Sequence, residues 1–196
     1  MSRNRRSFDR PSPRIALAGA LFVGLTSAGC FFIGDSESRD ENLVNFRDFY
    51  DLLPEEIGDF RRTSREGGSG GAFGFRVSAV EAEYEAGSGA EIDVSIVDTG
   101  ALGAIGLEAF ADWLDVEVDE ESDRGWARTM EYKGDPAIEE FERTSGDRGS
   151  AEFAWFVQDR FVIVLEGNDI TADELYELRD AIDVDRLADL RDREGN

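Results

Sequence analysis

Apolar side chains alternate with polar ones over residues 80–84 and again over residues 92–96, on either side of a Gly-Ser-Gly segment at 87–89. Alternation with a period of two is typical of a strand that buries one face and leaves the other in water. A short glycine-rich connection between two such strands is typical of a hairpin. The pattern therefore predicts an antiparallel hairpin with one wet face.

Two more pairs of strands are predicted further along the chain. Residues 126–132 and 137–143 are joined by Lys133-Gly134-Asp135-Pro136, which has the glycine and proline of a turn. Residues 153–157 and 161–165 are joined by a tight turn, and apolar residues occupy both faces of this second pair. We expect the second pair to be the central hairpin of the sheet, covered on both sides.

Three segments have the three- and four-residue spacing of an amphipathic helix. They are residues 43–53, which Pro54 follows, residues 107–114, and residues 175–182, which follow a capping box of Thr171 and Glu174. The glycines of residues 67–71 predict a flexible loop. This order of elements predicts an α+β fold, with helices packed on one antiparallel sheet of about six strands. We expect a single domain over residues 42–192.

The first 29 residues have the layout of an export signal. Five arginines and one aspartate in residues 1–14 precede an uncharged stretch from Ile15 to Gly29. That stretch is shorter than the ~20 residues that a membrane-spanning helix needs. It ends in small side chains directly before Cys30, so we expect cleavage there, followed by a polar tether over residues 30–41.

The segment before Cys30 resembles the lipobox of prokaryotic lipoproteins, although Ser27 stands where that motif usually has leucine. The resemblance implies that the thiol of Cys30 is lipidated and holds the domain on the extracytoplasmic face of the cell membrane. An uncleaved signal anchor is the alternative, because residues 31–33 extend the uncharged run to Gly34, which gives 20 residues, enough to span a membrane. Both hypotheses place the folded part outside the cytoplasm.

Arg5 and Arg6, with Phe8 two positions later, resemble the twin-arginine export motif in part. Asp9 and Arg10 differ from the residues that usually follow in that motif. The resemblance implies that the domain folds before it is exported.

The composition is strongly acidic. The chain has 44 Asp and Glu, 21 Lys and Arg and no His, and without residues 1–29 it keeps 43 acidic and 16 basic residues. Lys133 is the single lysine. An acidic surface with arginine in place of lysine resembles that of proteins from extreme halophiles, because molar salt screens repulsion beyond about 3 Å. The same charge argues against nucleic acid as a partner, since no basic patch follows residue 14.

The acidic run from Asp115 to Asp123 superficially has the alternation of a calcium loop. It lacks the central glycine, and Trp126 stands where the loop needs its last glutamate, so we expect a solvated loop or helix end and no metal site. Asp98 follows an apolar strand and could face a cleft, but capping of the next turn is the simpler interpretation.

Several chemistries are excluded by the residues present. Without histidine there is no imidazole base or ligand, and a single cysteine allows no disulfide within the chain. We therefore expect no catalytic residues of those classes and no cofactor. Carboxylate pairs could still hydrolyse glycosides or hold divalent cations.

The tryptophans are the remaining candidates for ligand contact. Trp155 lies in the strongest core pattern, so we expect it to be buried. Trp126 and Arg128 fall on one face of the same strand, and an aromatic ring beside an arginine can hold an anionic or planar ligand. Ordinary packing of Trp126 is the alternative.

The domain also resembles a group of uncharacterised secreted prokaryotic lipoproteins of the halophile type, over most of residues 43–190. The shared features are Leu53-Pro54 before a glycine, a strand ending near Tyr84, the run Ile92 to Asp98, Tyr132-Lys133-Gly134 with Pro136-Ala137, and Asp159-Arg160-Phe161 leading to Glu166-Gly167. The likeness implies a loosely PsbP-like fold but no chemistry. We therefore expect a membrane-tethered, non-enzymatic module that binds an extracytoplasmic ligand or protein. The alternative is a carboxylate-dependent hydrolase of cell-envelope polymers.

Overall fold

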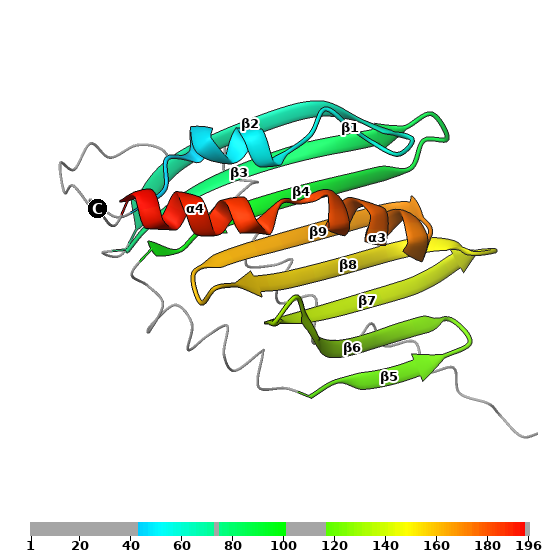
Figure 1. The fold of residues 1–196 in the computed structure, drawn as a ribbon. Coiled ribbons are helices and arrows are strands. Elements are labelled where there is room, and N and C mark those ends of the chain that lie inside the picture. Colours follow the sequence, from blue (N-terminus) through cyan, green and yellow to red (C-terminus); the bar gives the residue numbers. More distant parts are fainter. Residues whose placement is uncertain (1–42, 73–74, 101–116, 195–196) are drawn as a thin grey trace, which may run out of the picture. The chain divides into compact units, whose positions relative to one another are not determined.

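The computed structural model describes residues 43–72, 75–100 and 117–194. These residues form one nine-stranded sheet in which every neighbouring pair of strands is antiparallel (Figure 1). The strands are β1 (Glu56–Ile57), β2 (Phe60–Ala72), β3 (Phe75–Ala86), β4 (Glu91–Asp98), β5 (Asp119–Ser122), β6 (Gly125–Tyr132), β7 (Asp135–Ser145), β8 (Arg148–Val157) and β9 (Phe161–Ile170).

The sheet consists of two meanders, β1 to β4 and β5 to β9. They join where β4 pairs with β9, so the strand order is β1-β2-β3-β4-β9-β8-β7-β6-β5. Three helices are described: the 3-10 helix η1 (Phe46–Leu52) and the C-terminal helices α3 (Ala172–Ala181) and α4 (Val184–Glu194).

The prediction of an α+β fold with about six strands is wrong. The described residues are mostly one nine-stranded antiparallel sheet, and their α-helical structure is confined to the short C-terminal segment of α3 and α4. The expectation of a loosely PsbP-like fold is wrong for the same reason. Residues 67–71, predicted as a loop, lie inside β2, and residues 119–122 of the acidic run form the edge strand β5.

The predicted strand pairs are confirmed. Residues 80–84 and 92–96 pair in β3 and β4, and residues 126–132 pair with 137–143 in β6 and β7. The hairpin of β8 and β9 is buried on both faces, with Trp155 and Ile163 at most 1% exposed on one and Phe156 and Val162 at most 4% exposed on the other.

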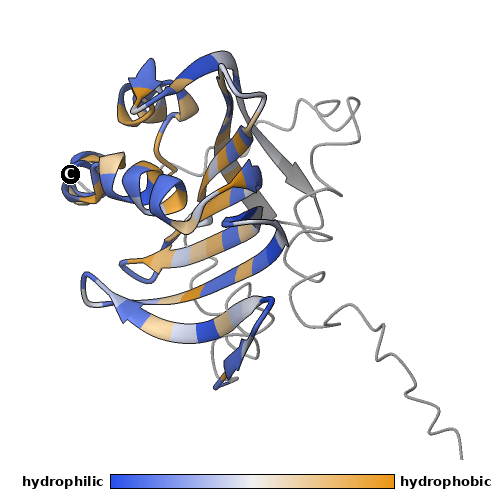
Figure 2. Ribbon diagram, turned by 90° about the vertical axis from the view of Figure 1, so that its right-hand side faces the viewer, coloured by the Kyte–Doolittle hydropathy of each residue, from blue (hydrophilic) through white to orange (hydrophobic). Residues whose placement is uncertain are grey.

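The main core lies between one face of the sheet and the three helices. In Figure 1 the helices lie in front of the sheet, and Figure 2 shows them together on one side of it. Alternate residues of β3, β4, β9 and β8 point into this core, which Phe49, Leu52, Leu175, Leu178 and Leu187 close from the helical side. The capping box predicted at Thr171 and Glu174 begins α3, and Leu175, Leu178 and Ile182 are buried as expected.

The predicted helix at residues 107–114, the leader, Cys30 and Trp113 lie outside the described residues. Among the helices of the described ranges, none combines the length and the apolar character needed to cross a membrane.

Candidate functional site

The pairing of β6 with β7 brings Trp126 and Arg128 to a buried carboxylate. Trp126 lies opposite Phe141 and Arg128 lies opposite Glu139, on the helix-covered face of the sheet. Gly125 precedes Trp126 with φ +152°, and a Cβ at this position would lie 1.7 Å from the carbonyl oxygen of Phe141. Only glycine therefore lets β6 begin so close to β7.

Glu139 is 1% exposed and accepts three hydrogen bonds on a single oxygen. Its Oε1 lies 2.7 Å from Nε1 of Trp126, 2.6 Å from Nη2 of Arg128 and 2.9 Å from the hydroxyl of Tyr176 on α3. Its other oxygen, Oε2, is buried and has no hydrogen-bond partner. We call Trp126, Arg128, Glu139 and Tyr176 the Glu139 cluster.

The protonation states in the cluster favour these contacts. Burial alone would lower the pKa of Arg128, but the charge and hydrogen bond of Glu139 outweigh it and raise that pKa above its usual range. Burial, with the neighbouring charge of Glu139, raises the pKa of Tyr176. Arg128 therefore stays charged at neutral pH, and Tyr176 keeps the proton that it donates.

The carboxylate of the Glu139 cluster is buried, whereas the side chains that donate to it are partly exposed to solvent. The ring of Trp126 stacks on Phe141 with centroids 4.8 Å apart and an interplanar angle of 21°. Trp126 and Tyr176 are half-buried, whereas the side chain of Arg128 is 47% exposed. Asp119 lies opposite Arg128 on the edge strand β5. A ligand could therefore approach along the exposed surface of Arg128 and Trp126.

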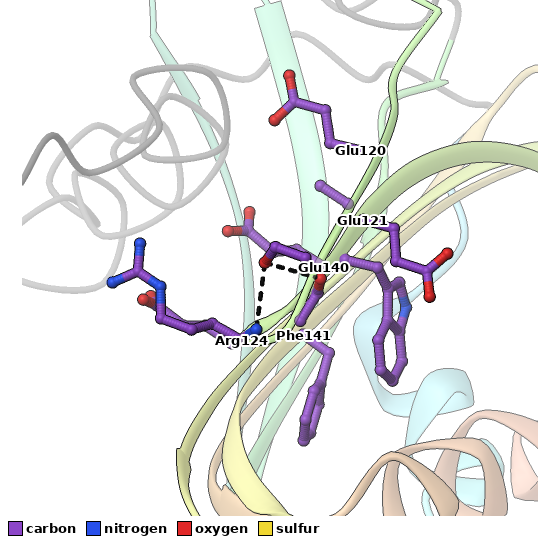
Figure 3. Close-up of a pocket in the computed structure, with 10 residues that line it drawn as sticks. Glu120, Glu121, Arg124, Glu140 and Phe141 are labelled. Atoms are coloured by element: carbon purple, nitrogen blue, oxygen red, sulfur yellow. Dashed lines mark hydrogen bonds between the residues drawn. The ribbon is translucent and has the colours of Figure 1, made fainter. Parts of the chain in front are cut away.

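A hollow of about 180 Å³ surrounds the β5–β6 turn beside the cluster, and Trp126 and Phe141 contribute to its lining. Figure 3 shows Glu120, Glu140 and Arg124 on one side of the strands and Glu121 on the other. The turn is held by the hydroxyl of Ser122, 3.2 Å from the amide nitrogen of Arg124 and 3.3 Å from the carbonyl oxygen of Gly125.

A second group of aromatic side chains adjoins the cluster, and an arginine of the same chain already covers its rings. The guanidinium carbon of Arg179 lies 4.1 Å from the ring centroid of Tyr132, 4.7 Å from that of Tyr176 and 5.4 Å from that of Phe153. Burial and a hydrogen bond to Asp180 raise the pKa of Tyr132 to about 12. Because the guanidinium of Arg179 already lies against these rings, we interpret this aromatic group as internal packing.

Five carboxylates form a row across the opposite face of the sheet. Each lies opposite the next on the neighbouring strand, in the order Glu83, Asp93, Glu166, Glu152, Glu140. Burial and the charges of Glu166 and Glu140 raise the pKa of Glu152 to about 8. We call these residues the acidic row. Across the described ranges, no three His, Cys, Asp or Glu side chains are arranged to hold a metal ion.

Two other candidates from the sequence, Asp98 and Trp155, have roles in stabilising the fold. Asp98 is fully buried and accepts from the backbone N–H of Gly100 at 2.8 Å, so it caps the following turn. Trp155 is 1% exposed and lies in the main core. Arg5, Arg6 and Cys30 lie outside the described residues.

The sequence reasoning missed Glu139 and Tyr176. Glu139 alternates with the buried Ala137 and Phe141 on β7, so an acid on an apolar face was a visible signal. Tyr176 carries no such signal, because it reaches the cluster only through the packing of α3 against the sheet.

No protein-family model, no curated protein and no solved structure matches this chain. The site is therefore interpreted from its own geometry.

Proposed function

We propose that this chain is an extracytoplasmic binding module, held at the membrane through Cys30, and that the Glu139 cluster is its ligand site. The basic leader, the small residues before Cys30 and the polar segment that follows support the tether. The tether would keep the binding domain close to the membrane and free to meet ligands outside the cytoplasm.

The unpartnered oxygen of Glu139 carries the proposal for the site. Leaving a buried carboxylate oxygen without a donor costs free energy, and folded proteins rarely do so without a functional or structural reason. Here the oxygen lies in the same cluster as a half-exposed arginine and a half-buried indole. Because this oxygen has no exposed surface, a ligand would reach it only by displacing a side chain of the cluster, and a hydrogen-bond donor on that ligand would then remove the cost.

Fluorine NMR of the full-length chain, with fluorotryptophan at its three tryptophans, tests the site. The probes are small neutral, cationic and anionic fragments in molar KCl, and the variant Trp126→Phe identifies the signal of Trp126. We expect fragments to move the Trp126 signal and to lose this effect in Glu139→Gln but not in Glu140→Gln, whose side chain faces the other side of the sheet. Fragments that move no signal, or only signals other than that of Trp126, contradict the proposal.

A carboxylate-dependent hydrolase is the second candidate, and the acidic row favours it. A Glu152 that holds its proton near neutral pH beside Glu140 and Glu166 provides the acid and the base that such chemistry needs. Release of reducing sugar ends from envelope polysaccharide by the wild type, and its loss in Glu152→Gln, would establish this activity. Equal release by both proteins, or none by either, excludes it.

A further inference from the structure

Six apolar side chains form a continuous patch on the face of the sheet opposite the main core. Each is at most 6% exposed, and they lie opposite one another across four neighbouring strands. We call them the apolar patch: Val97 on β4, Val162 and Val164 on β9, Ala154 and Phe156 on β8, and Ile138 on β7.

The apolar patch is buried, but the described helices do not bury it. The helices η1, α3 and α4 pack on the main core, on the other side of the sheet (Figure 2). Strands that are apolar on both faces are found where both faces are covered. Since the patch is at most 6% exposed within a single chain, its cover belongs to the same chain and lies outside the described ranges.

Residues 101–116 connect the two sides of this patch. They begin shortly after the end of β4, where Val97 of the patch lies. They precede Val118, whose backbone N–H donates to the hydroxyl of Thr129 on β6 at 3.1 Å, and Thr129 lies opposite Ile138 of the patch. The chain therefore passes from β4 to β6 and has to cross β9, β8 and β7.

The length of residues 101–116 suits this crossing. Neighbouring strands lie ~4.8 Å apart, so the distance from β4 to β6 in this sheet is about 19 Å. At a rise of ~1.5 Å per residue, the segment extends about 24 Å even as one continuous helix. A crossing on the other face would meet the helices that already cover the main core.

The sequence of this segment supplies the apolar side chains that a cover needs. Leu107, Phe110 and Leu114 recur at the spacing of one helical face. The charged residues recur at the same spacing but fall on the opposite face of such a helix, and they are Glu108, Asp112 and Asp115. A segment with this pattern can bury one side on the sheet and keep the other in water.

The other undescribed parts of the chain are less suited to cover the patch. Residues 34–42 have polar or charged side chains apart from one glycine, and residues 73–74 and 195–196 are too short. Residues 1–33 contain the leader and the segment expected at the membrane. Residues 101–116 are therefore the part of the chain whose length, end points and composition all fit.

We propose that residues 101–116 dock on the apolar patch through Leu107, Phe110 and Leu114 and form a third layer of the domain. This inference does not depend on the Glu139 cluster. It makes the patch unavailable to a membrane or to a partner protein. A ligand of this face would instead meet the acidic row, which is the next row of side chains on the same strands and is at least partly exposed.

Labelling of introduced thiols in the full-length chain tests the inference. Cys30→Ser removes the native thiol. In this background, Val162→Cys places a patch thiol and Ile163→Cys a core thiol on adjacent residues of β9 that face opposite sides of the sheet. A buried thiol reacts with a water-soluble maleimide only when its cover opens, so we expect slow labelling of both in molar KCl.

The segment is then weakened on one side and, as a control, changed on the other. Phe110→Ser with Leu114→Ser should speed labelling of the patch thiol about tenfold or more, because the open state becomes more populated. The core thiol should stay slow, which separates loss of the segment from unfolding of the domain. The matched control, Glu108→Ser with Asp112→Ser, should leave both rates unchanged.

A fluorine measurement keeps the test decisive if the first pair of substitutions unfolds the domain. With fluorotryptophan in the chain, Trp113→Phe identifies the signal of Trp113 inside the segment. Phe156→Leu, which alters the patch and keeps it apolar, should move that signal. Leu187→Met, in the main core, should not.

Four results would overturn the inference. They are fast labelling of the patch thiol beside an intact segment, equal labelling rates in the weakened and control segments, and a Trp113 signal that ignores Phe156→Leu. The fourth is labelling of the patch thiol that speeds up on dilution of the protein, because a second copy of the chain would then be the cover.

Discussion

Asp98 and Arg160 form a bidentate ion pair inside the domain, with Oδ1 2.7 Å from Nε and Oδ2 2.7 Å from Nη2. Asp98 ends β4 and Arg160 directly precedes β9, so the pair joins the two meanders at one end of the sheet. The carboxylate also accepts from the backbone N–H of Val44 at 2.7 Å, which fixes the start of the described domain.

Replacing Asp98 with Asn should destabilise the domain strongly. The amide would turn donors toward Arg160, and removing one partner of a buried pair costs about 3–5 kcal/mol. Asp93→Asn is the matched control, since Asp93 lies on the same strand but faces the acidic row. It should leave stability unchanged or raise it. Denaturation midpoints in molar salt measure both, and a loss below about 1 kcal/mol for Asp98→Asn would contradict the assigned role.

The acidic row predicts that stability falls as the pH rises. The pKa of Glu152 is raised from 4.5 to about 8 in the folded protein, so the folded state holds this proton more tightly than the unfolded state. Stability from this group is therefore fully present below pH 4.5 and is lost as the pH rises through about 8. Burial raises the pKa of Glu81, Asp93, Glu140 and Glu166 as well, in the same direction.

Glu152→Gln should flatten this dependence and stabilise the protein above pH 8 by roughly 2–4 kcal/mol. Glu85→Gln, at an exposed position at the end of β3, is the control and should keep the wild-type slope. Unfolding free energies measured at several pH values between about 5 and 9 decide the point. A wild type whose free energy of unfolding rises towards alkaline pH would contradict the prediction, because ionising the acidic row would then not destabilise the fold.

Replacing Trp155 should destabilise the domain more than replacing Trp126. Trp155 is 1% exposed, so Trp155→Ala leaves a large cavity and should cost about 3–5 kcal/mol. Trp126→Ala loses the stacking on Phe141 and the bond to Glu139 at a half-buried position, and should cost about 2 kcal/mol. Chemical denaturation of both variants compares them. A Trp126 variant as unstable as the Trp155 variant would make Trp126 a core residue only.

The sequence predicted the strands whose burial differs between their two faces. Residues 92–96 alternate because one side lies in the core, and that period survives in β4. The glycine-rich segment around Gly67 predicts a loop, but it lies inside the strand β2. A Cβ at Gly67 would lie 2.7 Å from the ring of Phe46, so glycine lets η1 pack against β2. The sequence also does not predict the strand at residues 119–122. This edge strand is fully exposed, so it has no buried face that would make apolar and polar residues alternate.

The candidate site was predicted in part. Trp126 and Arg128 share a strand face, as expected, and both donate to the same oxygen of Glu139. The pairing of β6 with β7 and the position of α3 decide what they meet. Long-range contacts of this kind leave no periodic signal in the sequence.

Salt should be required for the fold if the acidic composition reflects a high-salt solvent. At about 0.01 M salt the Debye length grows to roughly 30 Å, so carboxylates across the whole sheet repel one another. We expect the full-length chain to lose cooperative unfolding, followed by circular dichroism, when it is dialysed from molar KCl into dilute buffer. An unchanged midpoint would make the acidity incidental to stability.

Mass spectrometry of the N-terminal peptide of the membrane-extracted protein tests the central claim most directly, because an extracytoplasmic binding module must first be exported and held at the membrane. We predict a mature chain that begins at Cys30 and carries the mass of acyl groups on that residue, and an unprocessed precursor in Cys30→Ser. Replacing Arg5 and Arg6 together with Lys should block export through the twin-arginine route. A native protein that keeps residues 1–29 and has a free thiol at Cys30 would contradict the lipid tether.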